Sequence, residues 1–134
     1  MQPFGKISEN ILQQLQNIVG KSFCLVDDES KLHYGHDETE DLRYYPEVIL
    51  KPQTTEQVSA ILKICFAENL PVTPRGAGTG LSGGALPVHG GVLLSLERMN
   101  HIINIDEENF QATVEPGVIT EVLQNAVREK GLFY

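Results

Sequence analysis

The residues with the clearest chemical pattern lie in a glycine-rich stretch near the middle of the chain. Residues 74–84 read PRGAGTGLSGG, so that five glycines surround a single charge, Arg75. Glycine gives the backbone access to left-handed conformations, and consecutive N–H groups in such a segment can converge on an anion. No acidic residue lies between Glu68 and Glu97, although the chain has a net charge of −8. The stretch therefore predicts a phosphate site made of main-chain groups, with tight turns and no ligand as the alternative.

Two familiar phosphate-binding motifs do not fit this stretch. A Walker A loop needs a lysine followed by serine or threonine, and the stretch contains no lysine. Gly78, Gly80 and Gly83 match the dinucleotide pattern GxGxxG, but that pattern must open a helix whose N-terminus holds the pyrophosphate. Pro87 and a Gly-Gly pair follow where the interior of that helix would lie, and helices do not tolerate such a composition. The predicted site is therefore a loop without a helix.

Other residues that could do chemistry give weaker signals. His33, His36 and Asp37 could be imagined as metal ligands, but no fourth ligand is evident, and a solvated loop is the favoured interpretation. Cys24 and Cys65 lie far apart among apolar residues without CxxC spacing, which indicates buried, inert thiols rather than a disulfide or a nucleophile. No catalytic residue and no metal site are assigned.

The elements before the glycines must support them. Apolar residues at helical spacing predict a first helix that ends at Gly20, and residues 23–26 read as a short strand. The polar segment 27–47 reads as an irregular connector. Residues 1–47 are therefore expected to form an N-terminal helix and a connector.

A β-α-β unit is predicted immediately before the glycines. A strand at 48–52 precedes a helix that starts at the capping-box pair Thr54 and Gln57 and runs to about Glu68. A second strand at 70–74 leads directly into the glycines. A crossover of this length predicts that the two strands are parallel.

After the glycines, the pattern changes to strands and a last helix. Segments 92–96, 101–105 and 111–115 are strand-like, and the polar turn between the last two predicts an antiparallel hairpin. Thr120 is the expected cap of the final helix, and Gly131 its stop. The predicted fold class is α/β (α+β): a β-α-β subdomain followed by the start of a second subdomain with a mixed or antiparallel sheet, to which all three strands are assigned.

Composition limits the classes of function. Hydrophobic residues make up 41% and charged residues 21%, which is typical of a globular chain. The net charge of −8 and the lack of a Lys/Arg cluster argue against a nucleic-acid partner. No apolar run has the length of a signal peptide core or of a bilayer span, so the cytoplasm is the expected location and no transmembrane segment is expected.

Three sequence blocks carry a family resemblance. They read YPEVILKPQTTEQV, PRGAGTGLSGGALPVHGGVLLSLERMN and TVEPGVITEVLQ, in this order. Together they resemble the FAD-linked oxidases of the vanillyl-alcohol oxidase and p-cresol methylhydroxylase type, most closely the branch of glycolate oxidase and D-lactate dehydrogenase. The resemblance covers about Gly20 to Tyr134. It implies that residues 48–134 are the N-terminal part of an FAD-binding domain of the p-cresol methylhydroxylase type.

The resemblance also implies a cofactor and its contacts. The glycine-rich stretch of the family wraps the pyrophosphate of FAD with backbone N–H groups. Relatives with covalently attached flavin commonly carry a histidine in this stretch, whereas Thr79 stands at about that position here, so non-covalent FAD is expected. Gly117, in the turn EPGV, is the expected contact near the flavin. The pyrophosphate contacts fall on Pro74, Arg75, Gly76, Ala77, Gly78, Thr79, Gly80, Leu81 and Ser82.

The implied activity is oxidation of a small D-2-hydroxy acid, such as lactate or glycolate, by hydride transfer to FAD. The alternatives are a same-fold oxidase of another alcohol and a truncated, non-catalytic nucleotide-binding module. The apolar ending at Tyr134 suggests a cut, with the remainder of a parent chain as a partner. The 134 residues alone are then expected to be inactive and to self-associate through an exposed sheet edge.

Overall fold

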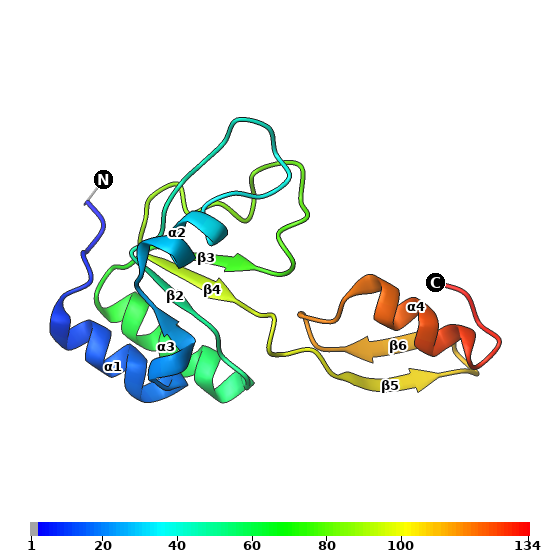
Figure 1. Cartoon of the computed structure of the whole chain (residues 1–134). Helices are drawn as coiled ribbons and strands as arrows, with labels where there is room; N and C mark the ends of the chain where they lie inside the picture. Colours follow the sequence, from blue (N-terminus) through cyan, green and yellow to red (C-terminus); the bar gives the residue numbers. More distant parts are fainter. Residues whose placement is uncertain (1–2) are drawn as a thin grey trace.

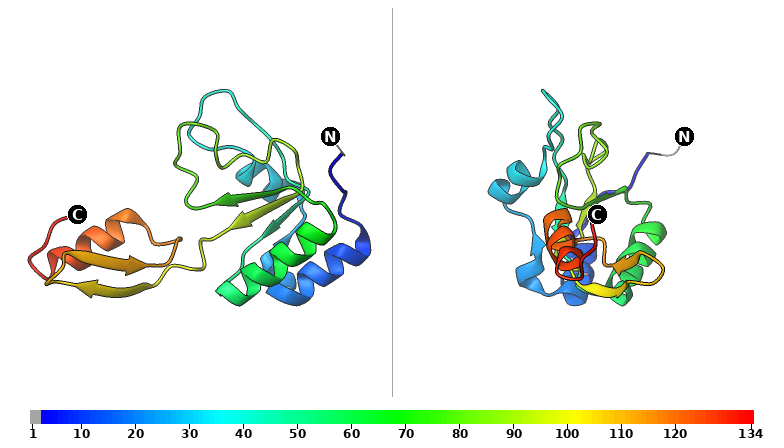
Figure 2. Two further views of the ribbon diagram at one scale, coloured as in Figure 1. Left: turned by 180° about the vertical axis from the view of Figure 1, so that it is seen from behind. Right: turned by 90° about the vertical axis from the view of Figure 1, so that its right-hand side faces the viewer.

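The computed structural model describes residues 3–134, which form two lobes joined by one extended segment (Figure 1). The views of Figure 2 show the same elongated arrangement from behind and from one end. The first lobe contains α1 (Glu9–Val19), a 3-10 helix (Lys21–Phe23), β1 (Cys24–Leu25), α2 (Asp28–Tyr34), β2 (Val48–Leu50), α3 (Thr55–Ala67), β3 (Val72–Arg75) and β4 (Val92–Ser95). The second lobe contains β5 (Ile102–Asp106), β6 (Gln111–Val114) and α4 (Thr120–Arg128).

The sheet of the first lobe has the strand order β1-β2-β4-β3. β2 and β3 both run parallel to β4, so the predicted parallel orientation of the two strands of the β-α-β unit is confirmed. They are not neighbours, because β4 lies between them. The assignment of the strand at 92–96 to the second subdomain is wrong. All four residues of β4 are buried, which suits a central strand covered on both faces.

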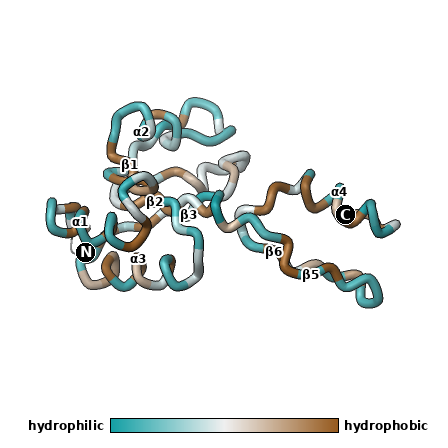
Figure 3. Tube along the Cα trace, turned by 60° about the horizontal axis from the view of Figure 1, so that its bottom comes forward, coloured by the Kyte–Doolittle hydropathy of each residue, from teal (hydrophilic) through white to brown (hydrophobic). Residues whose placement is uncertain are grey.

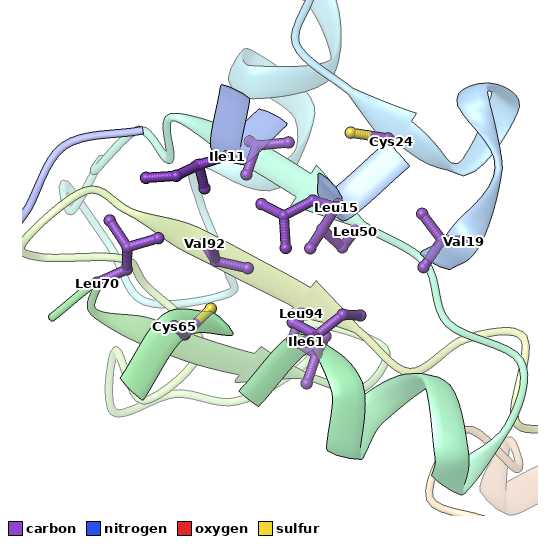
Figure 4. Packing of buried hydrophobic residues seen from close by; sticks show 11 residues of the cluster. Ile11, Leu15, Val19, Cys24, Leu50, Ile61, Cys65, Leu70, Val92 and Leu94 are labelled. Carbon is purple, nitrogen blue, oxygen red and sulfur yellow. The ribbon is translucent and has the colours of Figure 1, made fainter. Parts of the chain in front are cut away.

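Alternate residues of the strands build two cores, one on each face of this sheet. Val48, Leu50 and their neighbours in β4 pack against α1 and α3, and Figure 4 shows this cluster at close range. Ile49 and Leu93 point to the other face, where Tyr34 of α2 covers them. The alternation follows from the two-residue period of a strand. In Figure 3, apolar segments gather at the centre of this lobe and recur along β6 and α4.

The predicted end of α1 at Gly20 and the predicted start of α3 at Thr54 are confirmed, whereas Ser8, which caps the start of α1, was not predicted. The Ser8 hydroxyl accepts a hydrogen bond from Ile11 N at 3.3 Å, and Gly20 ends α1 with a φ of 89°. The Thr54 hydroxyl accepts from Gln57 N at 3.2 Å, as a capping residue should. The Gln57 side chain accepts from Gln53 N rather than from Thr54 N, at 2.7 Å.

Two local predictions are wrong. The connector at 27–47 was expected to be irregular, but it contains α2, because the Asp27 carboxylate caps a helix by accepting from Ser30 N at 2.8 Å. Thr120 was expected to cap the last helix. It is instead the first helical residue of α4, and Ile119 occupies the capping position without a side-chain hydrogen bond.

The predicted hairpin of the second lobe is confirmed as β5 and β6, which pair antiparallel. Asp106 holds the turn, because its carboxylate accepts from the backbone of Glu108 at 3.1 Å and of Asn109 at 3.0 Å. Leu123 and Val127 of α4 are buried, whereas large apolar side chains such as Ile103, Phe110 and Phe133 are exposed. Self-association through the edge of this two-stranded sheet stays a prediction.

None of the helices within residues 3–134 combines the length and the apolar character that a membrane crossing requires.

The two cysteines should react only when the chain unfolds. Cys24 and Cys65 are free, buried thiols, and burial raises the pKa of each to about 11. Iodoacetamide at pH 8 should leave both unmodified in the native chain and modify both in denaturant, as counted by mass spectrometry. Between the ordinary pKa of 9.0 and about 11, unfolded thiols lose protons that the folded state keeps, so stability should fall as pH rises through this window. Rapid native labelling would contradict the burial.

Candidate functional site

A cleft of about 500 Å³ lies between the two lobes, beside the carboxyl ends of β3 and β4. Crevices beside the carboxyl ends of parallel strands are the usual ligand sites of α/β sheets. The first lobe contributes the end of α2, the start of the loop that follows β3, and Glu97 just beyond β4. The second lobe contributes the turn before α4 and its first residues. The cleft is lined by His33, Tyr34, Arg75, Gly76, Ala77, Glu97, Asn100, Gly117, Ile119 and Val122.

The cleft brings together some of the predicted contact residues. Arg75, Gly76, Ala77 and Gly117 line it, although Gly117 lies far from the others in sequence. Pro74 is exposed at the end of β3. The others continue away from the cleft along the glycine-rich loop, which we define as residues 76–91. They are Gly78, Thr79, Gly80, Leu81 and Ser82, all exposed or half-buried.

The glycine-rich loop offers main-chain donors. Within the described part of the chain, no backbone N–H of residues 76–82 donates a hydrogen bond to a protein group. Consecutive N–H groups without a protein acceptor can bind an anion. A side chain added at Gly80 would have no atom within 4 Å, so a ligand can approach the main chain closely there. The loop therefore has the donors and the open space that a phosphate group needs.

Gly78 is fixed as glycine by its conformation and by its neighbour. Its φ is 74°, in the left-handed region that side chains disfavour. A Cβ at this position would also collide with the guanidinium of Arg75, including its Nε at 2.9 Å. The loop thus packs directly on the arginine side chain.

The side chain of Arg75 lies under the glycine-rich loop rather than in solvent. It is only 7% exposed, and its Nη1 donates to the carbonyl oxygen of His36 at 2.7 Å. The guanidinium also lies over the ring of Tyr34, 5.6 Å from its centroid. The one positively charged side chain of the stretch therefore supports the loop. The main-chain N–H groups of the loop remain free to bind an anion.

Position 117 requires a glycine, because its backbone lies too close to other main-chain atoms to leave room for a side chain. Its N–H donates to the carbonyl oxygen of Met99 at 2.7 Å, so this donor is already used. A Cβ would come within 2.8 Å of the same oxygen and would also meet the carbonyl of Leu96. Close by, the Glu115 carboxylate accepts from His101 N at 2.8 Å. These contacts fix the turn at 115–118 against the segment that joins the lobes, and so fix one wall of the cleft.

A polar network that sequence reasoning missed forms another wall. The Tyr34 hydroxyl donates to Glu97 Oε1 at 2.7 Å, and Lys51 Nζ lies 2.7 Å from the same oxygen. Burial raises the pKa of Tyr34, so its phenol stays protonated. Burial alone would also raise the pKa of Glu97, but the hydrogen bonds from Lys51 and Tyr34 outweigh it and lower that pKa. The cleft thus presents a carboxylate that can accept hydrogen bonds from hydroxyl groups.

The histidines of the connector do not form a metal centre in the described residues. His33 lines the cleft, and His36 Nδ1 lies 3.2 Å from the carbonyl oxygen of Leu32. Among residues 3–134, no three His, Cys, Asp or Glu side chains converge as ligands of an ion would.

Comparison with known families and sequences gives consistent matches. The family described as "FAD binding domain" matches residues 46–134. Glycolate oxidase subunit GlcD of Bacillus subtilis is 41% identical over 128 residues, which are 96% of this chain and 27% of that protein. D-lactate dehydrogenase of Anaerostipes hadrus is 37% identical over 132 residues, which are 98% of this chain and 28% of that protein. The chain thus spans about a quarter of the length of these relatives.

Solved structures share the fold. A structure of p-cresol methylhydroxylase with substrate bound superposes with a TM-score of 0.80 and 31% identity over 90% of this chain and 24% of that chain. The 4-ethylphenol oxidase from Gulosibacter chungangensis gives a TM-score of 0.81 and 29% identity over 97% of this chain and 27% of that chain. The expected fold class, an α/β domain of the p-cresol methylhydroxylase type, is confirmed.

Removing the Tyr34 hydroxyl should loosen the wall of the cleft. Tyr34→Phe loses the hydrogen bond to Glu97, which should cost about 1 kcal/mol and lower the thermal midpoint at pH 7 by roughly 3–5 °C. Tyr45→Phe is the matched control, because the Tyr45 side chain is half exposed, and its midpoint should stay within about 1 °C of the native value.

The effect of Tyr34→Phe should depend on pH. The pKa of Glu97 lies below its ordinary value of 4.5, so the carboxylate stabilises the fold above that pH and ceases to do so as pH falls through the folded pKa. The difference between Tyr34→Phe and the native chain should therefore shrink in acid. A difference that stays equal on both sides of the folded pKa of Glu97, located by NMR titration of its carboxyl group, would show that Glu97 is not the acceptor.

Proposed function

Because the chain belongs to the family of FAD binding domains, we propose that its glycine-rich loop and the cleft beside it form part of a site for FAD. The observation that carries the proposal is the run of N–H groups at 76–82 that lack a protein acceptor. In this proposal these groups hold the pyrophosphate. The residues proposed to contact FAD are Pro74, Arg75, Gly76, Ala77, Gly78, Thr79, Gly80, Leu81, Ser82 and Gly117.

The proposed contacts act in three ways. Residues 76–82 bind the pyrophosphate, because their main-chain donors are free and their side chains are small or exposed. Arg75 supports the loop from below while its backbone end lines the cleft. Gly117 brings the second lobe close to β4, so that the cleft is narrow enough for both lobes to touch one ligand. We take residues 48–134 as the cofactor-binding part and 1–47 as the segment that packs against it.

We propose that FAD is held without a covalent bond. Residues 76–84, which include the groups proposed to hold the pyrophosphate, contain no histidine, cysteine or tyrosine, so this part of the loop lacks a side chain suited to a covalent flavin link. After loading with FAD and precipitation in acid, all the yellow colour should appear in the supernatant. Colour that stays in the washed pellet would contradict this proposal.

The proposed reaction is the oxidation of a small D-2-hydroxy acid such as lactate or glycolate. Bound FAD supplies an acceptor for a hydride. The residues of this chain bind and orient the cofactor and cover it from water on the side of the cleft. The names of two sequence relatives, a glycolate oxidase component and a D-lactate dehydrogenase, support the substrate class. The names of the structural neighbours, p-cresol methylhydroxylase and 4-ethylphenol oxidase, favour an alkylphenol as the second candidate.

The backbone conformation at Gly78 should be important for FAD binding by residues 1–134. We expect the native affinity to lie between about 1 mM and some tens of micromolar, or about −4 to −6 kcal/mol. Gly78→Ala should weaken it about tenfold, roughly 1.4 kcal/mol, because alanine disfavours the left-handed conformation and collides with Arg75. Gly84→Ala, at an open position of the same loop, should stay within twofold. Fluorescence titration of FAD measures both, and equal affinities would contradict the proposed cradle.

Residues 1–134 should not turn over substrate by themselves. They span about a quarter of the length of the sequence relatives. Glu97, the carboxylate that lines the cleft, is a weak base because hydrogen bonds from Lys51 and Tyr34 lower its pKa. With excess FAD and D-lactate, reduction of a dye acceptor should match a control with free FAD. Faster reduction would show that catalytic groups lie within these residues, and glycolate, L-lactate and p-cresol in parallel would then identify the substrate class.

A further inference from the structure

The connector between α2 and β2 contacts the glycine-rich loop at both ends of its free N–H groups. At the start of the loop, Arg75 Nη1 donates to the carbonyl oxygen of His36 at 2.7 Å. At the far end, Gly83 N donates to the hydroxyl of Thr39 at 2.9 Å. Figures 1 and 2 show the two segments side by side, above β3 in the view of Figure 1. The two contacts enclose residues 76–82, whose N–H groups are not used by the protein.

Asp37 holds the connector in the shape that these contacts need. It is 7% exposed, and its Oδ1 accepts from Thr39 N at 2.9 Å. Its Oδ2 is buried and has no protein partner within residues 3–134. A carboxylate is costly to bury unless hydrogen bonds and an opposite charge compensate it. Hydrogen bonds with Thr39, and to a lesser degree the positive charge of Arg75, lower the pKa of Asp37, so it is ionised at neutral pH.

We propose that Asp37 and Thr39 are positioning residues for the glycine-rich loop. Asp37 fixes the backbone of Thr39, and the Thr39 hydroxyl fixes Gly83, so the loop is held open before a ligand arrives. A glycine-rich loop loses much conformational entropy when it becomes ordered, and ordering it in advance strengthens binding. The inference rests on the proposed function, because it concerns the same loop and the same FAD.

The first test is FAD titration of variants of the full chain. Thr39→Val keeps the shape of the side chain and removes the acceptor for Gly83 N, and we expect about tenfold weaker binding. Thr39→Ser keeps the hydroxyl and should bind within twofold of the native chain. Asp37→Asn removes the charge and should bind about fivefold more weakly. Glu38→Gln is its control, because Glu38 is an exposed acid in the same connector, and it should bind within twofold.

The second test is hydrogen exchange of the Gly83 amide, measured by NMR without FAD. In Thr39→Val this amide should exchange at least tenfold faster than in the native chain, while the amides of Val92–Ser95 in β4 should be unchanged. Thr39→Ser should restore the native rate. Exchange that is faster throughout β4 would instead indicate general destabilisation and would overturn a local role.

The two tests separate the inference from the function on which it rests. If the native chain fails to bind FAD at millimolar concentration, the proposed function is overturned, and faster exchange at Gly83 in Thr39→Val would still support the positioning role. If the native chain binds FAD and Thr39→Val binds equally well, the positioning role is overturned and the FAD site stands. If Thr39→Val does not fold, the comparison of Asp37→Asn with Glu38→Gln decides in its place.

Discussion

The parallel pairing of β3 with β4 is the constraint on which the rest of the site depends. A chain that leaves β3 at its carboxyl end must return along the full length of the sheet before it can enter β4 in the same direction. Such a return usually contains a helix, which would satisfy its own N–H groups. Here residues 76–91 make the return without one. Leu86 and Pro87 anchor its second half by burial, and the first half keeps its donors free.

The same constraint explains why the side chain of the one arginine of the stretch is buried beneath the loop. A glycine-rich return has few side chains that could make stabilising contacts, so other parts of the first lobe must support it. Arg75 provides the support from below, by its bond to His36 and its contact with Tyr34. The connector provides the support from the side, through Thr39. Side-chain charge is therefore used inside the first lobe, and residues 76–84 carry no charged side chain.

Local patterns in the sequence were sufficient for several parts of this structure. The capping residue Thr54, the stop at Gly20, the hairpin and the glycine-rich stretch depend on neighbours a few residues away. The place of β4 depends on pairing with two strands at once, and its uniformly apolar sequence fits either a central strand or a strand of another sheet. Tyr34 and Glu97 are 63 residues apart, and Thr39 and Gly83 are 44 apart, so no local pattern could join them. The short α2 was missed because its capping residue, Asp27, looked like one more polar residue of a loop.

A loop whose main-chain N–H groups are left free also constrains how its sequence can change over time. Thr79, Leu81 and Ser82 are exposed, so substitutions there alter neither the free N–H groups nor the support beneath them. Gly78 cannot change without a compensating change at Arg75, and Gly117 cannot change without movement of the Met99 carbonyl. Evolutionary drift in this region should therefore be uneven, with variable exposed positions between constrained glycines.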